Sequence, residues 1–506
     1  MKKTAFMLML IGLLSKIFGF GRYIVLANYY GASNVSDAYL ISLTIPLTIF
    51  QFLGESISTT LIPIFNEITI DKNKQRAYRY INNLITFLTL ITIIVIGVSI
   101  NFAPYIVKIF ASGFEGETLQ LAVNITRITL VGIFFSVLMS VLRGYLYSNE
   151  HYYAAKLVGL PFNLIIMAST IISSFTNVYV LAYGTLLAMF SEFIIILWAS
   201  IKDGFKYKFT FDIKDKYIFR MLSLATPTMI GTSVNQINKV VDRTIASRVA
   251  IGGISALNYA NRLNLFIQQT FVLSISTVLY PTISKMAAEN NIKGLKRSLR
   301  EAVNSTSILV IPASIGAIVF SEPIVRVLFM RGAFDQIALE LSSSALMFYS
   351  VGMMGFGLRE ILSRAFYSLQ DTHTPMVNAS LGIILNIILN IILSKFLGIG
   401  GLALATSIAG LFTTFLLFLG LMKKIGALGM KEMLIVILKT LVASIAMGVV
   451  AFLIYNILNS STNELISLMI AVSIGALLYF GLIMTMKIND VDIIVDVIRK
   501  KFKKRR

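Results

Sequence analysis

Four ionisable side chains, Lys16, Arg22, Asp37 and Glu55, lie within an apolar stretch near the N-terminus. An ionisable group at membrane depth costs at least ~2.5–3.5 kcal/mol, so it marks a functional site unless it snorkels to the interface or forms a structural ion pair. Lys16 and Arg22 are separated by about 120° around a helix, so both can border one wide polar cavity. Either Asp37 or Glu55 could pair with these cations.

A second group of polar residues lies in the second half of the chain. Asp242 stands beside cations, and Arg262 follows in the next apolar segment, so a structural ion pair and a transport role are both open for this acid. Asn386 and Asn390 are four residues apart and share a helix face, and Thr406 lies in the next apolar segment. Their oxygens and that of Asp242 would suit a small hard cation, although carboxamides also hold helices together.

The composition identifies the kind of element that carries these groups. The chain has 506 residues, of which 57% are hydrophobic and 13% charged, which is typical of a polytopic membrane protein. Roughly fourteen segments are long and apolar enough to be spanning helices, and helices rather than a barrel satisfy the backbone in lipid. The expected spans are residues 5–29, 36–63, 80–104, 120–146, 154–175, 178–200, 221–247, 255–282, 300–320, 338–368, 375–396, 399–421, 433–457 and 464–486.

The distribution of charge predicts the orientation. An even number of spans places both termini on one side, and the clusters of Lys and Arg in the loops on that side predict that it is the cytoplasm. The net charge of +20 is therefore explained by topology, and we expect no nucleic-acid partner. The first residues lack a signal-peptide cleavage site and are expected to remain as the first span. The basic tail, residues 489–506, fits an amphipathic helix on an anionic lipid surface or a plain topology anchor.

An internal repeat predicts two related lobes. Residues 57–67 resemble residues 275–285, and residues 143–150 resemble residues 364–371, both at an offset of about 220 residues. A repeat of six helices runs the same way through the membrane, so the two copies should be related by a pseudo-twofold axis along the membrane normal. The predicted parts are an N-lobe (1–201), a cytoplasmic linker (202–216), a C-lobe (217–424), two further spans (425–488) and the tail (489–506), with a substrate path between the lobes.

Several enzyme classes are disfavoured. The chain has no cysteine, and its two histidines, His151 and His373, are far apart and beside predicted loops, which argues against a metal-enzyme site. No phosphate-binding Walker loop, zinc-protease motif or nucleophile elbow occurs in a usable context. We therefore expect no enzyme and no ATP hydrolysis, and transport would draw on an ion gradient, the membrane voltage or the gradient of the substrate.

A set of motifs is distributed over most of the chain. The motifs are Ser15-Lys16, Gly19, Arg22, Ser36-Asp37-Ala38, Pro46, Glu55, Pro63, Gln236-Ile237-Asn238, Asp242, Asn258 to Leu263, Arg331-Gly332-Ala333-Phe334, Arg364-Ala365-Phe366-Tyr367, Asp371 and Pro375. Their combination resembles one family, the MurJ lipid II flippases of the multidrug/oligosaccharidyl-lipid/polysaccharide exporter superfamily.

The resemblance implies a fourteen-helix, two-lobed, all-α transporter that works by alternating access in a bacterial plasma membrane. It would carry an undecaprenyl-pyrophosphate-linked cell-wall precursor, lipid II, from the inner to the outer leaflet, and act as a monomer. Family cavity cations correspond to Lys16, Arg22 and Arg262, which fits a pyrophosphate cargo that needs positive partners. A family sodium site would correspond to Asp242, Asn386, Asn390, the backbone of Leu402 and Thr406, and sodium is the one ion implied.

The sequence departs from the family pattern at a few positions. Tyr23 replaces a common acid, Phe50 and Gln51 replace a common basic pair, and Asn390 replaces a carboxylate. Two alternative functions stay open, a flippase for another polyprenyl-linked polysaccharide and a cation-coupled drug exporter, although an exporter of cationic drugs should have an acidic cavity. A membrane scaffold would leave the buried charges unexplained, and an enzyme acting on lipid-linked sugars lacks a clustered acid-base pair.

Overall fold

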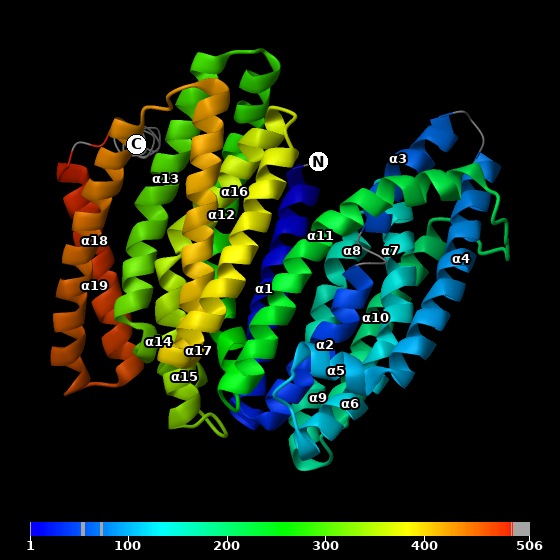
Figure 1. The fold of residues 1–506 in the computed structure, drawn as a ribbon, viewed down its shortest axis with the longest axis horizontal. Helices are drawn as coiled ribbons and strands as arrows, with labels where there is room; N and C mark the ends of the chain where they lie inside the picture. Colours follow the sequence, from blue (N-terminus) through cyan, green and yellow to red (C-terminus); the bar gives the residue numbers. More distant parts are fainter. Residues whose placement is uncertain (1, 52–55, 71–73, 487, 489–506) are drawn as a thin grey trace. The chain divides into compact units, whose positions relative to one another are not determined.

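The computed structural model describes the whole chain except residues 1, 52–55, 71–73, 487 and 489–506. Glu55 and the basic tail of residues 489–506 therefore lie outside the described residues. The predicted all-α fold is confirmed, because the regular elements of the described part are helices and it contains no strand (Figure 1).

The helices follow the predicted apolar segments closely. They are α1 Lys2–Tyr30, α2 Asn34–Phe50, α3 Ser56–Ile70, α4 Lys74–Asn101, α5 Ala103–Phe110, α6 Gly116–Leu130, α7 Gly132–Ser148, α8 Tyr153–Leu157, α9 Gly159–Phe175, α10 Val180–Lys202, α11 Lys216–Val249, α12 Gly253–Ala288, α13 Ile292–Val319, α14 Ser321–Phe329, α15 Gln336–Val351, α16 Met353–Ser368, α17 His373–Ile425, α18 Met430–Asn459 and α19 Glu464–Thr485.

Length and composition identify the helices that can cross a membrane. Among the described residues, nine helices are long and apolar enough, or up to eleven if each of two bent pairs counts as one span. Helix α17 has 53 residues, about 80 Å at 1.5 Å per residue, while a hydrocarbon core is about 30 Å thick. Its backbone breaks at Gly398, where φ is +54°, so α17 holds the two predicted spans 375–396 and 399–421. The full number of fourteen spans stays a prediction.

Contacts between the helices divide the chain into two compact units. The first comprises Met1–Ser255 with Arg331–Asp335, and the second comprises Ala256–Met330 with Gln336–Arg506. Helix α11 belongs to the first unit, where Arg243 donates a hydrogen bond to the Leu40 carbonyl at 3.0 Å and Thr244 donates one to the Ile109 carbonyl at 2.6 Å. The predicted lobe boundary at residue 217 stays a prediction.

Small residues let the helices of the first unit approach closely. A Cβ on Gly159 of α9 would lie 2.2 Å from the Ser15 hydroxyl of α1, and a Cβ on Gly184 of α10 would lie 2.1 Å from the Ser169 Cβ of α9. Asn163 of α9 donates a hydrogen bond to the Ser15 carbonyl at 3.4 Å. Close backbone approach at small residues is the usual way that helices associate in lipid. It fixes α1, which carries Lys16 and Arg22, against α9.

Three glycine turns in the first unit require left-handed backbone. Gly31, Gly252 and Gly332 have φ of +58°, +76° and +58°. A Cβ on Gly332 would lie 2.2 Å from the Asn28 carbonyl oxygen, and the same carbonyl accepts a hydrogen bond from the Ala333 N–H at 2.8 Å. These contacts tie the segment Arg331–Asp335 to the end of α1 and explain why it belongs to the first unit.

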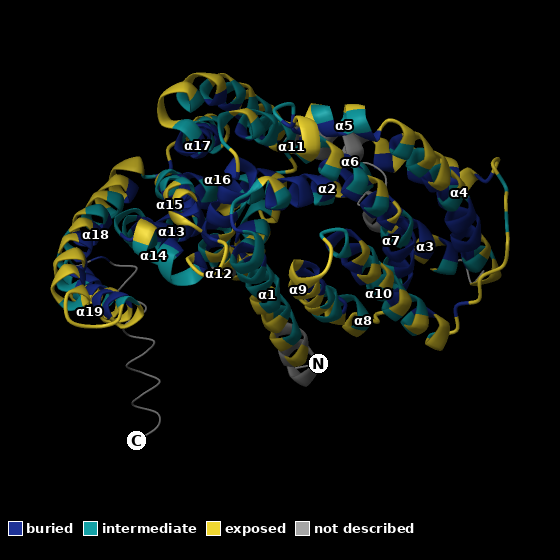
Figure 2. Cartoon of the chain, turned by 90° about the horizontal axis from the view of Figure 1, so that it is seen from below, coloured by how far each residue is buried: buried dark blue, intermediate teal, exposed yellow. Residues whose placement is uncertain are grey.

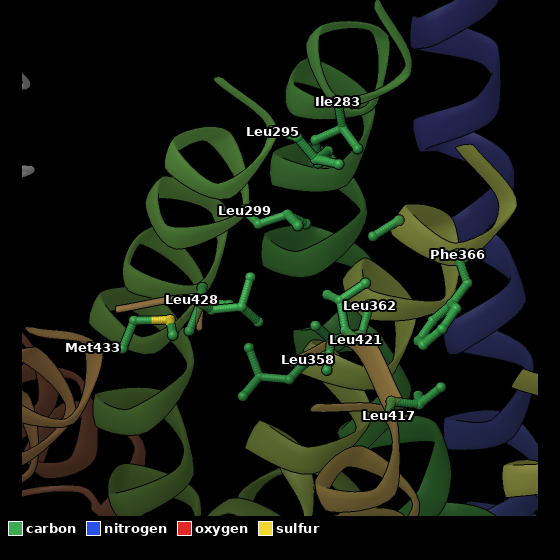
Figure 3. Packing of buried hydrophobic residues seen from close by; sticks show 12 residues of the cluster. Ile283, Leu295, Leu299, Leu358, Leu362, Phe366, Leu417, Leu421, Leu428 and Met433 are labelled. Carbon is green, nitrogen blue, oxygen red and sulfur yellow. The ribbon is translucent and has the colours of Figure 1, made fainter. Parts of the chain in front are cut away.

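The second unit contains an apolar core (Figure 3). Side chains from α12, α13, α16, α17 and α18 meet there, and Leu362 and Leu421 are fully buried. The outer surface of α18 is also apolar, and its Leu438, Val442 and Ile445 side chains are about half exposed or more. Figure 2 shows this exposed side of α18 in yellow. A large exposed apolar surface on a helix of 30 residues is what lipid contact requires.

Candidate functional site

Arg22 lies on α1 and is held by aromatic rings. Its guanidinium donates a hydrogen bond to the Tyr23 hydroxyl at 2.9 Å, and its Cζ lies 4.8 Å from the centre of the Tyr23 ring. The ring of Phe162 on α9 lies 5.5 Å from the same carbon. Cation–π contacts of this kind stabilise a partly desolvated cation by about 0.5–2 kcal/mol. Arg22 is therefore a fixed, partly buried positive charge inside the first unit.

The acid that interacts with Arg22 was not predicted from the sequence. Glu192 on α10 is partly buried and interacts electrostatically with Arg22 and with Arg143 of α7. Glu192 is the single acid of the predicted span 178–200. A lone acid in an apolar span indicates a functional charge, so this residue could have been selected from the sequence. The charged group around Arg22 therefore draws on three helices, α1, α7 and α10.

Lys16 and Arg262 occupy different units. Lys16 is exposed on α1, about one and a half turns from Arg22. Arg262 is exposed on α12 and belongs to the second unit. Lys16 and Arg22 thus share one helix of the first unit, while the convergence of Arg262 with them stays a prediction.

Asp37 has a partner other than the cations expected from the sequence. Its side chain is 1% exposed, and its Oδ1 accepts hydrogen bonds from the Ser255 N–H at 2.7 Å and from the Ser255 hydroxyl at 2.5 Å. The Ser255 hydroxyl also lies 2.8 Å from the Ser36 hydroxyl. Among the described residues, Asp37 forms no ion pair with Lys16 or Arg22. Its carboxylate instead stabilises the N-terminus of α12, where backbone N–H groups and the helix dipole favour a negative charge.

Four of the predicted sodium ligands form one hydrogen-bonded cluster in the second unit. Asn390 Nδ2 donates to Asn386 Oδ1 at 2.9 Å, and Asn386 Nδ2 donates to the Thr406 hydroxyl at 3.3 Å. That hydroxyl donates to the Leu402 carbonyl at 3.0 Å. The two asparagines precede the break at Gly398 and the other two residues follow it. The break in α17 thus brings amide, hydroxyl and carbonyl oxygens together, which are donors that a hard cation takes.

The fifth predicted ligand, Asp242, belongs to the first unit. It lies on α11, one helical turn from Asn238, whose Nδ2 donates to Asp242 Oδ2 at 3.4 Å. Within the part of the chain that the structure describes, no three His, Cys, Asp or Glu side chains are grouped as metal ligands. A sodium site would therefore rest on neutral oxygens of the second unit, and the participation of Asp242 stays a prediction.

The sequence is similar to known transporters along most of its length. The family described as lipid II flippase MurJ matches residues 26–473. A probable lipid II flippase MurJ of Buchnera aphidicola subsp. Baizongia pistaciae (strain Bp) is 30% identical over 471 residues, which cover 91% of each chain. The lipid II flippase MurJ of Burkholderia cenocepacia is 26% identical over 81% of this chain and 82% of its own.

Solved structures share the fold. A lipid II flippase MurJ in an inward closed conformation matches with a TM-score of 0.81 and 28% identity, over 94% of this chain and 98% of that one. An inward-facing multidrug resistance transporter of the MATE family matches with a TM-score of 0.69 and 17% identity, over 82% of this chain and 95% of that one. The second likeness concerns the fold alone, whereas the first extends to sequence.

Proposed function

The chain belongs to the MurJ family of lipid II flippases, and from this premise we propose that it carries a polyprenyl-pyrophosphate-linked peptidoglycan precursor from the inner to the outer leaflet by alternating access. It is a multi-pass bacterial membrane transporter and not an enzyme. We propose as well that both termini are cytoplasmic and that the protein acts as a monomer.

The fixed charge of Arg22 is the observation that supports an anionic cargo. The guanidinium has five N–H donors. The bond to Tyr23 uses one of them, and the contact with the Phe162 ring uses none. A guanidinium binds phosphate oxygens through two parallel hydrogen bonds, which suits a pyrophosphate head group. A cationic drug would instead be repelled by Arg22, so this residue favours the lipid-linked precursor over a drug as the cargo.

A complementation experiment tests the proposal. Cells depleted of their own lipid II flippase would express this chain, and lipid II exposed on the outer leaflet would be measured. We expect the unaltered chain to restore outer-leaflet lipid II and Arg22→Ala to lose that activity. Arg127→Ala is the matched control, because Arg127 is an exposed arginine that bonds only to the Ile100 carbonyl of its own unit, at 3.3 Å. Equal restoration by Arg22→Ala and Arg127→Ala at equal membrane amounts would refute the role of Arg22.

Arg22→Lys separates charge from geometry in the same assay. A lysine keeps the positive charge but cannot stack on Phe162 or bind two phosphate oxygens in a planar fork. We expect Arg22→Lys to restore lipid II only partly.

Sodium coupling is the second part of the proposal. The amide and hydroxyl oxygens of Asn386, Asn390 and Thr406 with the Leu402 carbonyl are hard, neutral donors that would hold Na⁺ in the second unit. Bound sodium would supply a positive charge to that side of α17. The residues themselves hold the two halves of α17 together through their hydrogen bonds, so the same side chains would link ion binding to the geometry of the break at Gly398.

A further inference from the structure

The connection between α10 and α11 is an ordered, non-helical segment held along α4. Asn83 of α4 donates to the Asp212 carbonyl and accepts from the Asp212 N–H, both at 2.8 Å, and Asn82 donates to the Lys206 carbonyl at 3.4 Å. The hydroxyls of Thr86 and Tyr207 lie 2.9 Å apart. Both views show the segment running beside α4 (Figures 1 and 2). Three neighbouring positions of one helix thus fix residues 206–212.

These contacts define the depth of the segment in the membrane. The first turns of α4 carry Lys74, Arg76 and Arg79, whereas no ionisable residue occurs from Leu84 to the end of the helix. The apolar part, residues 84–101, is about 27 Å long at 1.5 Å per residue, close to the thickness of the hydrocarbon core. The segment is bonded at the start of that apolar part. It therefore lies where lipid head groups meet hydrocarbon.

The segment exposes apolar and basic side chains in alternation. Its exposed apolar residues are Tyr207 (51%), Phe209 (77%), Phe211 (47%) and Ile213 (55%). The exposed basic residues between and beside them are Lys206, Lys208 and Lys214. Aromatic rings at head-group depth and lysines that reach phosphates are the two features of an anchor on an anionic membrane.

The acids of the segment are already paired within the first unit. The three pairs are Asp203 with His151 at 2.7 Å, Asp212 with Arg79 at 3.6 Å and Asp215 with Arg76 at 3.1 Å. Among the described residues, none of the three segment lysines takes part in an ion pair. The positive charge of the segment is therefore exposed and is not paired with an acid of the described residues.

We propose that residues 206–214 form a docking surface for anionic phospholipid head groups of the leaflet that they face. The rings of Phe209 and Phe211 enter the interfacial region, and Lys206 and Lys208 bind head-group phosphates. The fixed position of the segment at the polar end of α4 favours lipid over a soluble protein partner. This surface is separate from the groups around Arg22 and is independent of which cargo the chain carries.

The experiment places one tryptophan in the segment of the full-length chain. Trp198 is the only tryptophan, so Trp198→Phe with Phe209→Trp gives a single reporter at residue 209. The protein is reconstituted in lipid nanodiscs of phosphatidylcholine with increasing phosphatidylglycerol, either lipid carrying bromine near the head group. We expect blue-shifted emission that brominated phosphatidylglycerol quenches more strongly than brominated phosphatidylcholine at the same mole fraction.

Charge variants test the lysines in the same reporter background. Because a lysine near an anionic surface contributes about 1 kcal/mol, Lys206→Gln with Lys208→Gln should weaken the preference for phosphatidylglycerol by roughly fivefold for each lysine. The matched control is Lys293→Gln with Lys423→Gln, which removes the same charge from exposed lysines of the second unit and should leave the preference unchanged.

Two results would overturn the proposal. Emission typical of water with no quenching by either lipid would mean that residue 209 faces solvent or another protein. Equal quenching by both lipids, unaffected by the lysine variants and by salt, would mean that the segment does not bind head groups through charge. Neither result depends on lipid II transport, so the proposed function would be untouched by them.

Discussion

Removing the bond between Asp37 and Ser255 should destabilise the first unit more than removing an equally buried hydroxyl elsewhere. Ser255→Ala deletes the hydroxyl that bonds to Asp37 and Ser36 but keeps the backbone N–H that also bonds to Asp37. The matched control is Ser444→Ala. Ser444 is also fully buried, but its hydroxyl donates only to the Thr440 carbonyl of its own helix.

The bonds to Asp37 set the expected magnitude. A hydrogen bond to a charged group contributes about 1.5–3 kcal/mol, and a bond between neutral groups contributes about 0.5–1.5 kcal/mol. Ser255→Ala removes one of each, so we expect a loss of about 2–4 kcal/mol. Ser444→Ala removes one neutral bond within a helix and should cost about 1 kcal/mol or less. Asp37→Ala removes both charged bonds and leaves the N-terminus of α12 without its acceptor, so its cost should be about 3–5 kcal/mol.

Two measurements check this order. Reversible unfolding in mixed micelles gives the free energy of unfolding of each variant, and hydrogen exchange reports the protection of the Ser255 amide. We expect Asp37→Ala to lower the free energy of unfolding and the protection of the Ser255 amide most, followed by Ser255→Ala. Ser444→Ala should leave the Ser255 amide as protected as before. Equal losses for Ser255→Ala and Ser444→Ala, with unchanged protection of that amide, would refute the role of the carboxylate at the N-terminus of α12.

Three further predictions follow from local geometry. Gly332→Ala should destabilise the protein far more than Gly116→Ala, because both glycines have positive φ but only the Cβ at Gly332 would meet backbone, 2.2 Å away; equal melting temperatures would contradict this. The Lys424 ammonium, 2.8 Å from Asp371, holds the pKa of that carboxyl at about 2, below its unfolded value of about 3.9. This stabilisation is complete above about pH 4 and is lost as the pH falls toward 2. Lys424→Ala should therefore make the free energy of unfolding depend less on pH in this acid range. An unchanged pH dependence would disprove the pairing. Asn390→Leu should abolish any thermal stabilisation by sodium over potassium, and a retained sodium effect would exclude this residue as a ligand.

The fold was predictable because apolar length is a strong signal. The segment predicted at 154–175 coincides within two residues with α8 and α9 taken together, and the segment predicted at 464–486 coincides within two residues with α19. Where a helix differs from the predicted span at an edge, the helix continues beyond the apolar part. Helix α13 begins at Ile292 and not at residue 300, because its first turns carry lysines and arginines that an apolar window excludes.

The partners of the charged residues were harder to predict. Ser255 is 218 residues from Asp37, and no local pattern in the sequence relates them. The polar cluster of Asn386, Asn390 and Thr406 was easier, because its members lie on adjacent spans and one of the spacings is a helical turn. Spacing along one helix thus identified neighbours, whereas contacts between distant helices required the structure.

Arg22 shows how a cation can be kept inside a transporter without being neutralised. Among the described residues, no carboxylate lies within ion-pair distance of its guanidinium, and Glu192 acts on it only through its field. Burial of a charge is costly unless something compensates it, and the rings of Tyr23 and Phe162 supply part of that compensation. A tight ion pair would compensate it more fully, but an anionic ligand would then have to displace the carboxylate. Aromatic contacts therefore lower the cost of holding Arg22 in place, while the N–H donors that do not bond to Tyr23 can bind a phosphate.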